Sequence, residues 1–212
     1  MKPNFWIYSE PAEINRTAGS LVGFGAEIFK RAKIINEIDH LKSIKYKIDN
    51  KIIHPKETNI IEFIIEYLMD CIRFLIFFEN YMKAKLIIQG YCVHCIDKNY
   101  PGFSELAKAQ KKRPIKLKEI DDIEHFFVDE KNKIINHNAI KDKTIGIREL
   151  LSTEKYTNNY DFDSYIINFI HELNTYRNRL HFHENIDFQL SDKLISDLEM
   201  INKFVDKTMN IR

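Results

Sequence analysis

The sequence predicts an all-α fold, a bundle built mainly from long amphipathic helices. Three observations lead to this prediction. Apolar residues recur at helical spacing through several long stretches, hydrophobic residues make up 44% of the chain, and its 212 residues include only 6 Gly and 5 Pro. So few Gly and Pro argue against a sandwich of many short strands, whose turns depend on them. The hydrophobic content and the chain length allow a substantial core.

Two long helices are expected in the first half of the chain, over Ala12–Lys47 and Glu57–Ile96. Asn50 and Pro55 lie in the turn between them, so the simplest arrangement of the two helices is antiparallel. Gly90 is expected to bend or weaken the second helix. The first helix has one apolar stripe, formed by Ile28, Phe29, Ala32, Ile35, Ile38 and Leu41.

The middle of the chain, approximately residues 98–160, is predicted to be a loop-rich insertion with short helices. Its apolar content is too low for a core of its own, so residues 1–212 are expected to form a single domain. A helix that opens near Asp161 or Asp163 follows the insertion, and a final helix begins at Ser191-Asp192. The expected apolar faces are Tyr165, Ile166, Phe169, Ile170, Leu173 and Tyr176 in the first of these helices, and Leu194, Ile195, Leu198, Ile201, Phe204 and Val205 in the second.

The charge balance excludes a strong overall attraction to polyanions. The chain has 32 Lys and Arg against 31 Asp and Glu, a net charge of +1, so a nucleic-acid site must be a local patch. Lys111, Lys112 and Arg113 lie in such a patch, which either binds RNA phosphates or belongs to a solvated loop neutralised by the acidic residues after it. Charged residues interrupt every long apolar run, so no membrane span is expected. Three Cys and the lack of a signal peptide indicate the cytoplasm.

Polar residues crowd the end of an otherwise apolar helix between Arg177 and His183, where the sequence has two Arg, one Asn and two His. Such groups are costly to bury unpaired, so they are expected to face water, a partner or a substrate. Arg presents a planar charged fork to phosphate oxygens, and His transfers protons near neutral pH. The set is suited to phosphodiester chemistry. The alternative is a solvated helix end that pairs with Glu172 and Glu184.

This segment resembles the motif of the HEPN domain superfamily, which has an Arg, a polar residue directly after it and a His several residues later. Arg177, Asn178 and His183 match this motif, with five residues between the Arg and the His. The long helix with Phe78–Lys85, followed by Gly90-Tyr91, is also similar to the long second helix of HEPN proteins. The resemblance therefore implies a HEPN-like helical bundle.

The resemblance implies metal-independent cleavage of RNA without a cofactor, in which a His acts as acid or base while the ribose 2′-OH attacks the adjacent phosphorus. It implies a homodimer that brings two motifs to one cleft. It also implies a toxin or defence effector, with RNA as substrate and an antitoxin or regulatory protein as a further partner. The alternative is a non-catalytic HEPN module that binds a partner protein or a nucleotide.

The resemblance leaves the choice of catalytic His open. His183 has the family spacing, but in an unbroken helix His181 would share a face with Arg177, since residues four apart are neighbours. Arg179 and Glu79 are expected to support the site, although Glu79 is also spaced to pair with Lys83. We expect no metal site.

A zinc site at the cysteines near the end of the second helix is the weaker interpretation. Cys92 and Cys95 form one spaced pair, whereas structural zinc usually needs two such pairs. Both residues are expected to be small apolar members of a buried helix face.

Overall fold

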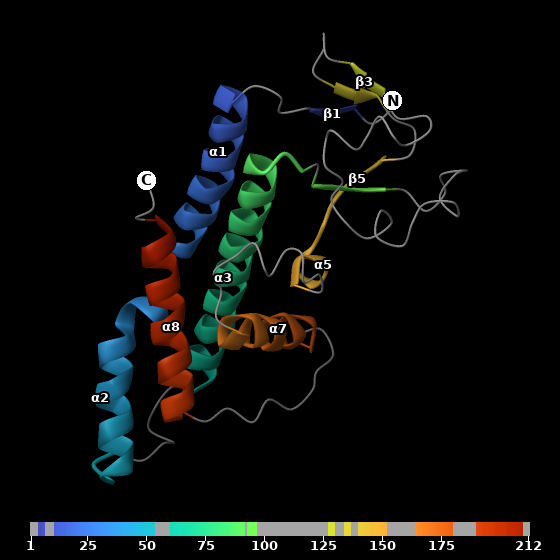
Figure 1. Cartoon of the computed structure of the whole chain (residues 1–212). Coiled ribbons are helices and arrows are strands. Elements are labelled where there is room, and N and C mark those ends of the chain that lie inside the picture. The colour runs from blue at the N-terminus through green and yellow to red at the C-terminus, as the bar shows by residue number, and fades with distance from the viewer. Residues whose placement is uncertain are drawn as a thin grey trace. The chain divides into compact units, whose positions relative to one another are not determined.

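The computed structural model describes residues 4–6, 11–53, 60–91, 93–96, 127–129, 134–136, 140–151, 164–179 and 190–209 (Figure 1). Helices form most of this part of the chain, which confirms the prediction of a mainly helical protein. The helices are α1 (Pro11–Phe29), the short 3-10 helix η1 (Ile35–Glu37), α2 (Ile38–Asp49), α3 (Ile60–Ile88), α5 (Ile147–Leu151), α7 (Ser164–Arg179) and α8 (Asp192–Met209).

Short strands accompany the helices, and the sequence did not predict them. They are β1 (Asn4–Trp6), β2 (His94–Ile96), β3 (Phe127–Asp129), β4 (Ile134–Asn136) and β5 (Ile140–Thr144). They form an antiparallel sheet in the order β1-β4-β3 and an antiparallel pair of β2 with β5. Strands of three to five residues are too short to show a clear alternating pattern. Cys95 lies in strand β2. The expectation that Cys95 belongs to a buried helix face is therefore wrong.

The chain divides into two compact units, and each of them combines segments that are distant in sequence. The first unit comprises Met1–Gly23 and Glu79–Tyr160, and the second comprises Phe24–Phe78 and Asp161–Arg212. Helices α1 and α3 each contribute residues to both units. The single domain over residues 1–212 stays a prediction.

Aromatic side chains from three helices form the core of the second unit. Phe29 of α1, Phe74 and Phe77 of α3, and Phe204 of α8 are all buried. The ring centroids of Phe74 and Phe204 lie 6.0 Å apart with the rings perpendicular, an edge-to-face contact. Phe29 lies 6.2 Å from Phe74. Phe29, from the stripe predicted for the first helix, and Phe204, from the stripe predicted for the last, therefore pack against α3.

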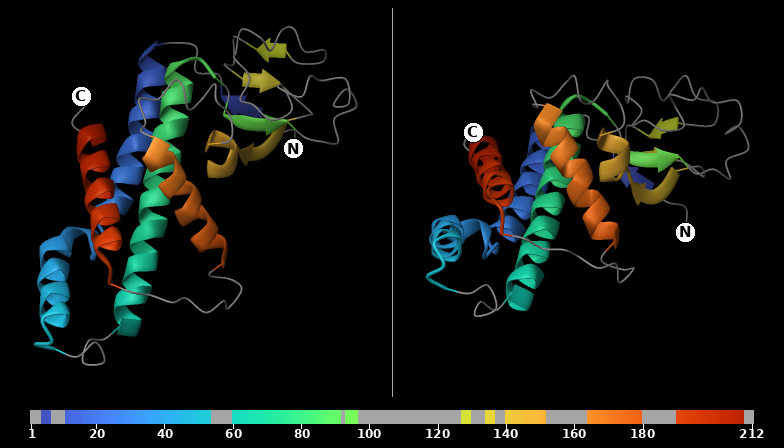
Figure 2. Two further views of the ribbon diagram at one scale, coloured as in Figure 1. Left: turned by 60° about the horizontal axis from the view of Figure 1, so that its bottom comes forward. Right: turned by 90° about the horizontal axis from the view of Figure 1, so that it is seen from below.

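Helix α8 contacts two neighbouring helices of the second unit and runs antiparallel to one of them, α2. Its ion pairs with α2 join Lys42 to Glu199 at 2.5 Å and Lys45 to Asp192 at 3.3 Å, so residue numbers rise along one helix as they fall along the other. Two contacts join α8 to α7, which crosses it in Figure 1: the Tyr165 hydroxyl donates to Asp197 at 2.6 Å, and Lys193 lies 3.6 Å from Glu172. Figure 2 shows α2 and α8 side by side in both further views.

The predicted starts and apolar faces of α7 and α8 are largely confirmed. The Ser191 hydroxyl accepts a hydrogen bond from the Leu194 amide at 3.2 Å, as an N-cap does. All six residues of the face expected for α8 are buried, namely Leu194, Ile195, Leu198, Ile201, Phe204 and Val205. On α7, Phe169, Ile170 and Leu173 of the expected face are buried, Ile166 is half-buried, and 45% of Tyr165 is exposed. Its hydroxyl is bonded to Asp197, and this contact raises the pKa of Tyr165.

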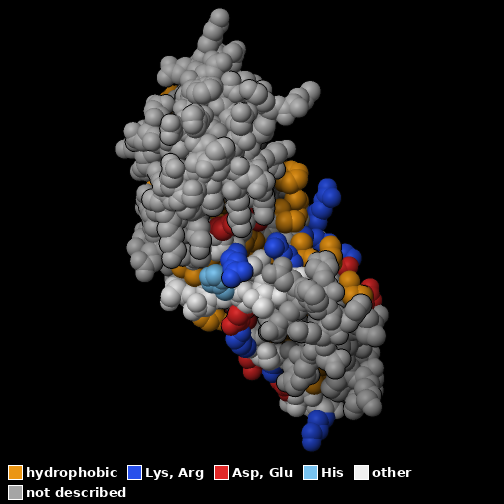
Figure 3. Space-filling view, turned by 90° about the vertical axis from the view of Figure 1, so that its right-hand side faces the viewer, with side chains coloured by type: hydrophobic (Ala, Val, Ile, Leu, Met, Phe, Trp, Pro, Cys, Tyr) orange, Lys and Arg blue, Asp and Glu red, His pale blue; other side chains and the backbone are white. Residues whose placement is uncertain are grey.

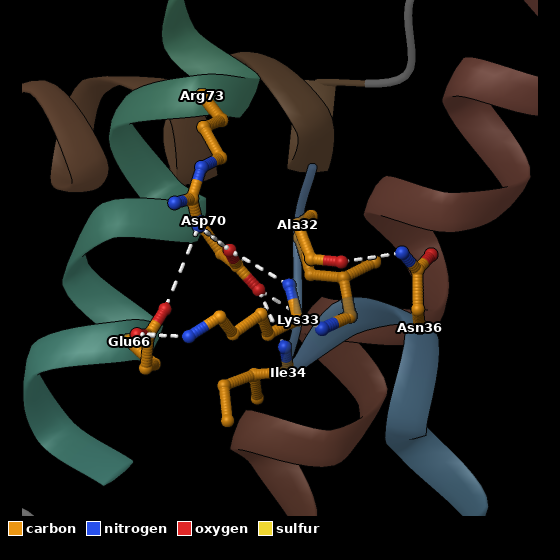
Figure 4. A network of polar contacts seen from close by, with 8 residues as sticks. Ala32, Lys33, Ile34, Asn36, Glu66, Asp70 and Arg73 are labelled. Atoms are coloured by element: carbon orange, nitrogen blue, oxygen red, sulfur yellow. Dashed lines mark hydrogen bonds and ion pairs between the residues drawn. The ribbon is translucent and has the colours of Figure 1, made fainter. Parts of the chain in front are cut away.

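The chain between α1 and α2 turns around one buried carboxylate, Asp70 of α3 (Figure 4). Its oxygens accept hydrogen bonds from the backbone amides of Lys33 at 3.1 Å, Ile34 at 2.7 Å and Ile35 at 3.1 Å. The Arg73 guanidinium donates to the same carboxylate. The backbone amides at the start of a helix lack intrahelical acceptors. Here the Asp70 carboxylate is the acceptor for three of them. The single helix predicted over Ala12–Lys47 is therefore wrong, because a distant side chain stabilises a break within it.

Glycine ends α3 in the first unit. Gly90 has φ +81°, a conformation that residues with a side chain rarely adopt. The amide of Gly90 donates to the carbonyl of Ile87 and the amide of Tyr91 donates to that of Leu86, both at 2.9 Å. This is the Schellman arrangement that satisfies the last carbonyls of a helix. Gly90 thus terminates the helix, a stronger effect than the predicted bend.

Lys83 of α3 connects the helix to strand β5 within the first unit. Its ammonium donates to Glu79 Oε1 at 2.5 Å and to Thr144 Oγ1 at 2.8 Å. Only 9% of the Lys83 side chain is exposed. A buried ammonium needs such partners, because an unpaired charge is costly away from water.

We expect Lys83→Met to lower the free energy of unfolding by about 1–3 kcal/mol, because Glu79 and Thr144 lose their common donor. Urea titration followed by circular dichroism would measure the change. Lys30→Met is the control, since Lys30 pairs with Glu27 on an exposed surface and such pairs contribute about 1 kcal/mol or less. Equal effects of the two substitutions would contradict a structural role for Lys83.

Candidate functional site

Arg177 lies on the apolar face of α7, where a charged residue is unexpected. It follows Leu173 by four residues and Ile170 by seven, a spacing that places all three on one face of the helix. Leu173 and Ile170 are buried, and Arg177 is half-buried. Its guanidinium forms no hydrogen bond or ion pair with any other residue that the structure describes. A half-buried cation in this state is suited to bind an anion.

The last described turn of α7 contains Arg177, Asn178 and Arg179. The backbone therefore places the Arg-Asn pair of the motif on one helical turn, in the second unit.

Several predicted site residues lie outside the described part of the chain. They are His181, His183, Lys111, Lys112 and Arg113. The choice between His181 and His183 thus stays open, as does the role of the basic patch.

Glu79, the predicted supporting residue on α3, pairs with Lys83 four residues further along. The pair belongs to the first unit, whereas Arg177 belongs to the second. The pairing agrees with the structural alternative for Glu79. Its supporting role stays a prediction.

Asn174 is a candidate site residue that the sequence analysis missed. It lies three residues before Arg177 on α7, and the two side chains are neighbours on the helix surface. Its Oδ1 atom is buried and accepts no hydrogen bond from another residue that the structure describes. Nearly all buried polar atoms are paired, so an exception calls for an explanation. The sequence signal that could have identified Asn174 is its spacing of three residues from Arg177, which places the two side chains side by side on a helix.

Several other charged groups of this unit are paired. Arg73 of α3 pairs with Asp70 and Glu66, and Lys33 donates to Glu66 at 2.7 Å, which lowers the pKa of Glu66. Asp197 accepts from Tyr165 and Lys193. These pairs connect helices to one another. Arg177 differs from Arg73 in having no such partner among the described residues.

Charges of both signs reach the surface of the described residues. On the face drawn in Figure 3, the coloured Lys and Arg side chains are interspersed with Asp and Glu and with hydrophobic side chains. This mixture agrees with the net charge of +1. An anion bound by the described side chains of this face would therefore be held by individual groups and not by a broad positive field.

Neither a metal cluster nor a membrane-spanning helix occurs in the described ranges. No group of three or more His, Cys, Asp or Glu residues there could hold a metal ion. Cys71 is buried within α3, and burial raises the pKa of its thiol to about 12. No helix among the residues that the structure describes is both long enough and apolar enough to cross a bilayer.

Comparisons with protein-family models, with the curated proteins and with the solved structures found no match for this chain.

Proposed function

We propose that the chain is a metal-independent endoribonuclease of the HEPN type that acts in the cytoplasm as a toxin or defence effector. In this reaction the ribose 2′-OH attacks the adjacent phosphorus, and the bond from phosphorus to the 5′-oxygen of the next nucleotide breaks. A His takes or returns the proton, while Arg177 neutralises the charge that develops on the phosphate oxygens. The products are a cyclic phosphate and a 5′-hydroxyl.

The state of Arg177 is the observation that supports this proposal. Its side chain is half-buried on the apolar face of α7 and has no ion pair with another described residue. A purely structural Arg in this position would be expected to pair with a carboxylate, as Arg73 does with Asp70. Phosphate is a natural counterion for a guanidinium, because the two match in geometry as well as in charge.

A non-catalytic module that binds a nucleotide or a partner protein is the second candidate. The charge of Arg177 supports it to the same degree, because a guanidinium can hold an anionic ligand and does not readily transfer protons. The two candidates differ in one result. Purified protein incubated with mixed RNA yields fragments ending in cyclic phosphate under the first proposal and intact RNA under the second.

We expect cleavage of RNA to persist in excess EDTA and to be absent on DNA of the same sequence. The proposed reaction uses only side chains of the protein and the 2′-OH of the substrate, which DNA lacks. Gel electrophoresis of labelled RNA and DNA, each with and without EDTA, would measure both effects. Activity that disappears with the chelator and returns with magnesium would contradict this mechanism.

We also propose that the active form is a homodimer, since one His cannot easily serve both the attacking and the leaving oxygen. Two copies in a symmetric dimer would bring two motifs together. Light scattering at roughly tens of micromolar protein is expected to give the mass of a dimer. A monomer that cleaves RNA at full rate at that concentration would contradict this part of the proposal. An antitoxin or regulatory protein is proposed as a further partner.

A further inference from the structure

Four exposed residues form a line along helix α1, and two of them are small. Arg16, Ser20, Gly23 and Glu27 follow one another at steps of four, three and four residues, so they lie on one side of this single helix. We call this line the α1 seam. An added Cβ at Gly23 would have no packing neighbour within 4 Å among the described residues. Since Gly is a poor helix former, its presence here is not explained by the packing of α1.

The charges of the α1 seam are arranged so that it complements a second copy of itself. Arg16 lies at one end and Glu27 at the other, with Ser20 and Gly23 between them. In an antiparallel helix pair with two-fold symmetry, each residue in the first half of a seam faces a residue in the second half of the partner's seam. A two-fold axis at the middle of the α1 seam places Arg16 opposite the partner's Glu27 and Ser20 opposite the partner's Gly23.

The residues beside the α1 seam agree with this register. Glu13 and Lys30 extend the line by one step at its two ends, and the same axis places them opposite each other as a further pair of opposite charge. Lys30 also pairs with Glu27 of its own chain at 2.5 Å, but a carboxylate can accept from two cations. Phe24 is 64% exposed at the edge of the seam. The axis brings both Phe24 side chains to the same side of the helix pair, where they add apolar contact.

We propose that the α1 seam is an interface between two copies of this chain, which pair their α1 helices antiparallel in a symmetric dimer. The small residues at its centre let the two backbones approach closely, and the opposite charges at its ends set the register. The inference assigns a surface to the homodimer of the proposed function and rests on that part of it. It does not require the dimer to cleave RNA.

The test measures the mass of the full chain by size-exclusion chromatography with light scattering over a range of concentrations. Arg16→Glu and Glu27→Arg each place like charges opposite one another at both ends of the seam, and each should raise the dissociation constant of the dimer about 10-fold or more. The double variant restores opposite charges and should return to within about 3-fold of the parent. Lys47→Glu is the matched control, since Lys47 is exposed on α2.

Gly23→Gln tests the close approach of the helices at the centre of the seam. Gln is a better helix former than Gly, and the exposed position has room for its side chain. The helical signal in circular dichroism should therefore be retained, while the dissociation constant of the dimer rises about 10-fold or more because the longer side chain separates the backbones. A helical variant that dimerises like the parent would overturn the inference.

The parent and the charge variants separate this inference from the proposed function. A parent that is monomeric at roughly 100 micromolar would overturn both the seam and the homodimer, and would leave this face of α1 to a different protein. A dimer that survives Arg16→Glu and Glu27→Arg pairs through another surface, so only the seam is wrong. Failure of the double variant to recover would show that Arg16 does not face Glu27. Dimers that respond as expected but leave RNA intact support the seam and contradict the proposed ribonuclease.

Discussion

Arg177→Ala is expected to abolish RNA cleavage, with a loss of about 10²–10³ in rate, because the proposed reaction loses the cation that stabilises charge on the phosphate. The fold should survive, since the side chain has no ion pair among the described residues to lose. Arg177→Lys should restore only part of the activity, because an ammonium lacks the planar fork of a guanidinium. Single-turnover cleavage of labelled RNA would measure the rates.

Arg31→Ala is the control for the loss of one positive charge. Arg31 is exposed and belongs to the same unit as Arg177. Parental cleavage by this variant, combined with inactivity of Arg177→Ala at an unchanged unfolding midpoint, would support the proposal. If Arg177→Ala cleaves RNA like the parent, the end of α7 is only a solvated helix terminus.

The same assay distinguishes the two candidate histidines. Loss of an acid or base costs about 10²–10⁴ in rate. We expect the larger loss from His183→Ala, because its spacing from Arg177 matches the motif that this segment resembles. A larger loss from His181→Ala would instead indicate that α7 continues far enough to place His181 beside Arg177.

Asp70→Ala is expected to lower the free energy of unfolding by about 3–5 kcal/mol, the cost of breaking a buried charged network. The substitution leaves three backbone amides and the Arg73 guanidinium without their acceptor in a fully buried site. Asp70→Asn should also destabilise, because its NH₂ group faces donors. Denaturant unfolding monitored by circular dichroism would measure both changes.

Asp39→Ala is the matched control for Asp70. Asp39 lies on α2 with its side chain fully exposed, and it is 3.7 Å from Lys42. Its loss should change the free energy of unfolding by about 0.5 kcal/mol or less. If Asp70→Ala has an equally small effect, the turn between α1 and α2 does not depend on this carboxylate.

The sequence by itself determined that the protein is mainly helical and which face of the last helix is buried. The stripe from Leu194 to Val205 in α8 is buried as its spacing predicts. Arg177 is placed by the same rule, because it continues the spacing of Ile170 and Leu173 beyond the last apolar residue of α7. Helical spacing is a local property, so it can be read without knowing what the helix packs against.

Only the tertiary structure decided where the first predicted helix breaks and which segments pair as strands. The break depends on hydrogen bonds that Asp70 accepts from backbone amides as far as 37 residues away, and strand β1 pairs Asn4 with Asn136. The unsatisfied state of Asn174 likewise depends on which groups surround its amide. Hydrogen-bond partners brought together by folding leave no periodic pattern in the chain, because each partner lies in a segment whose local sequence is independent of the other.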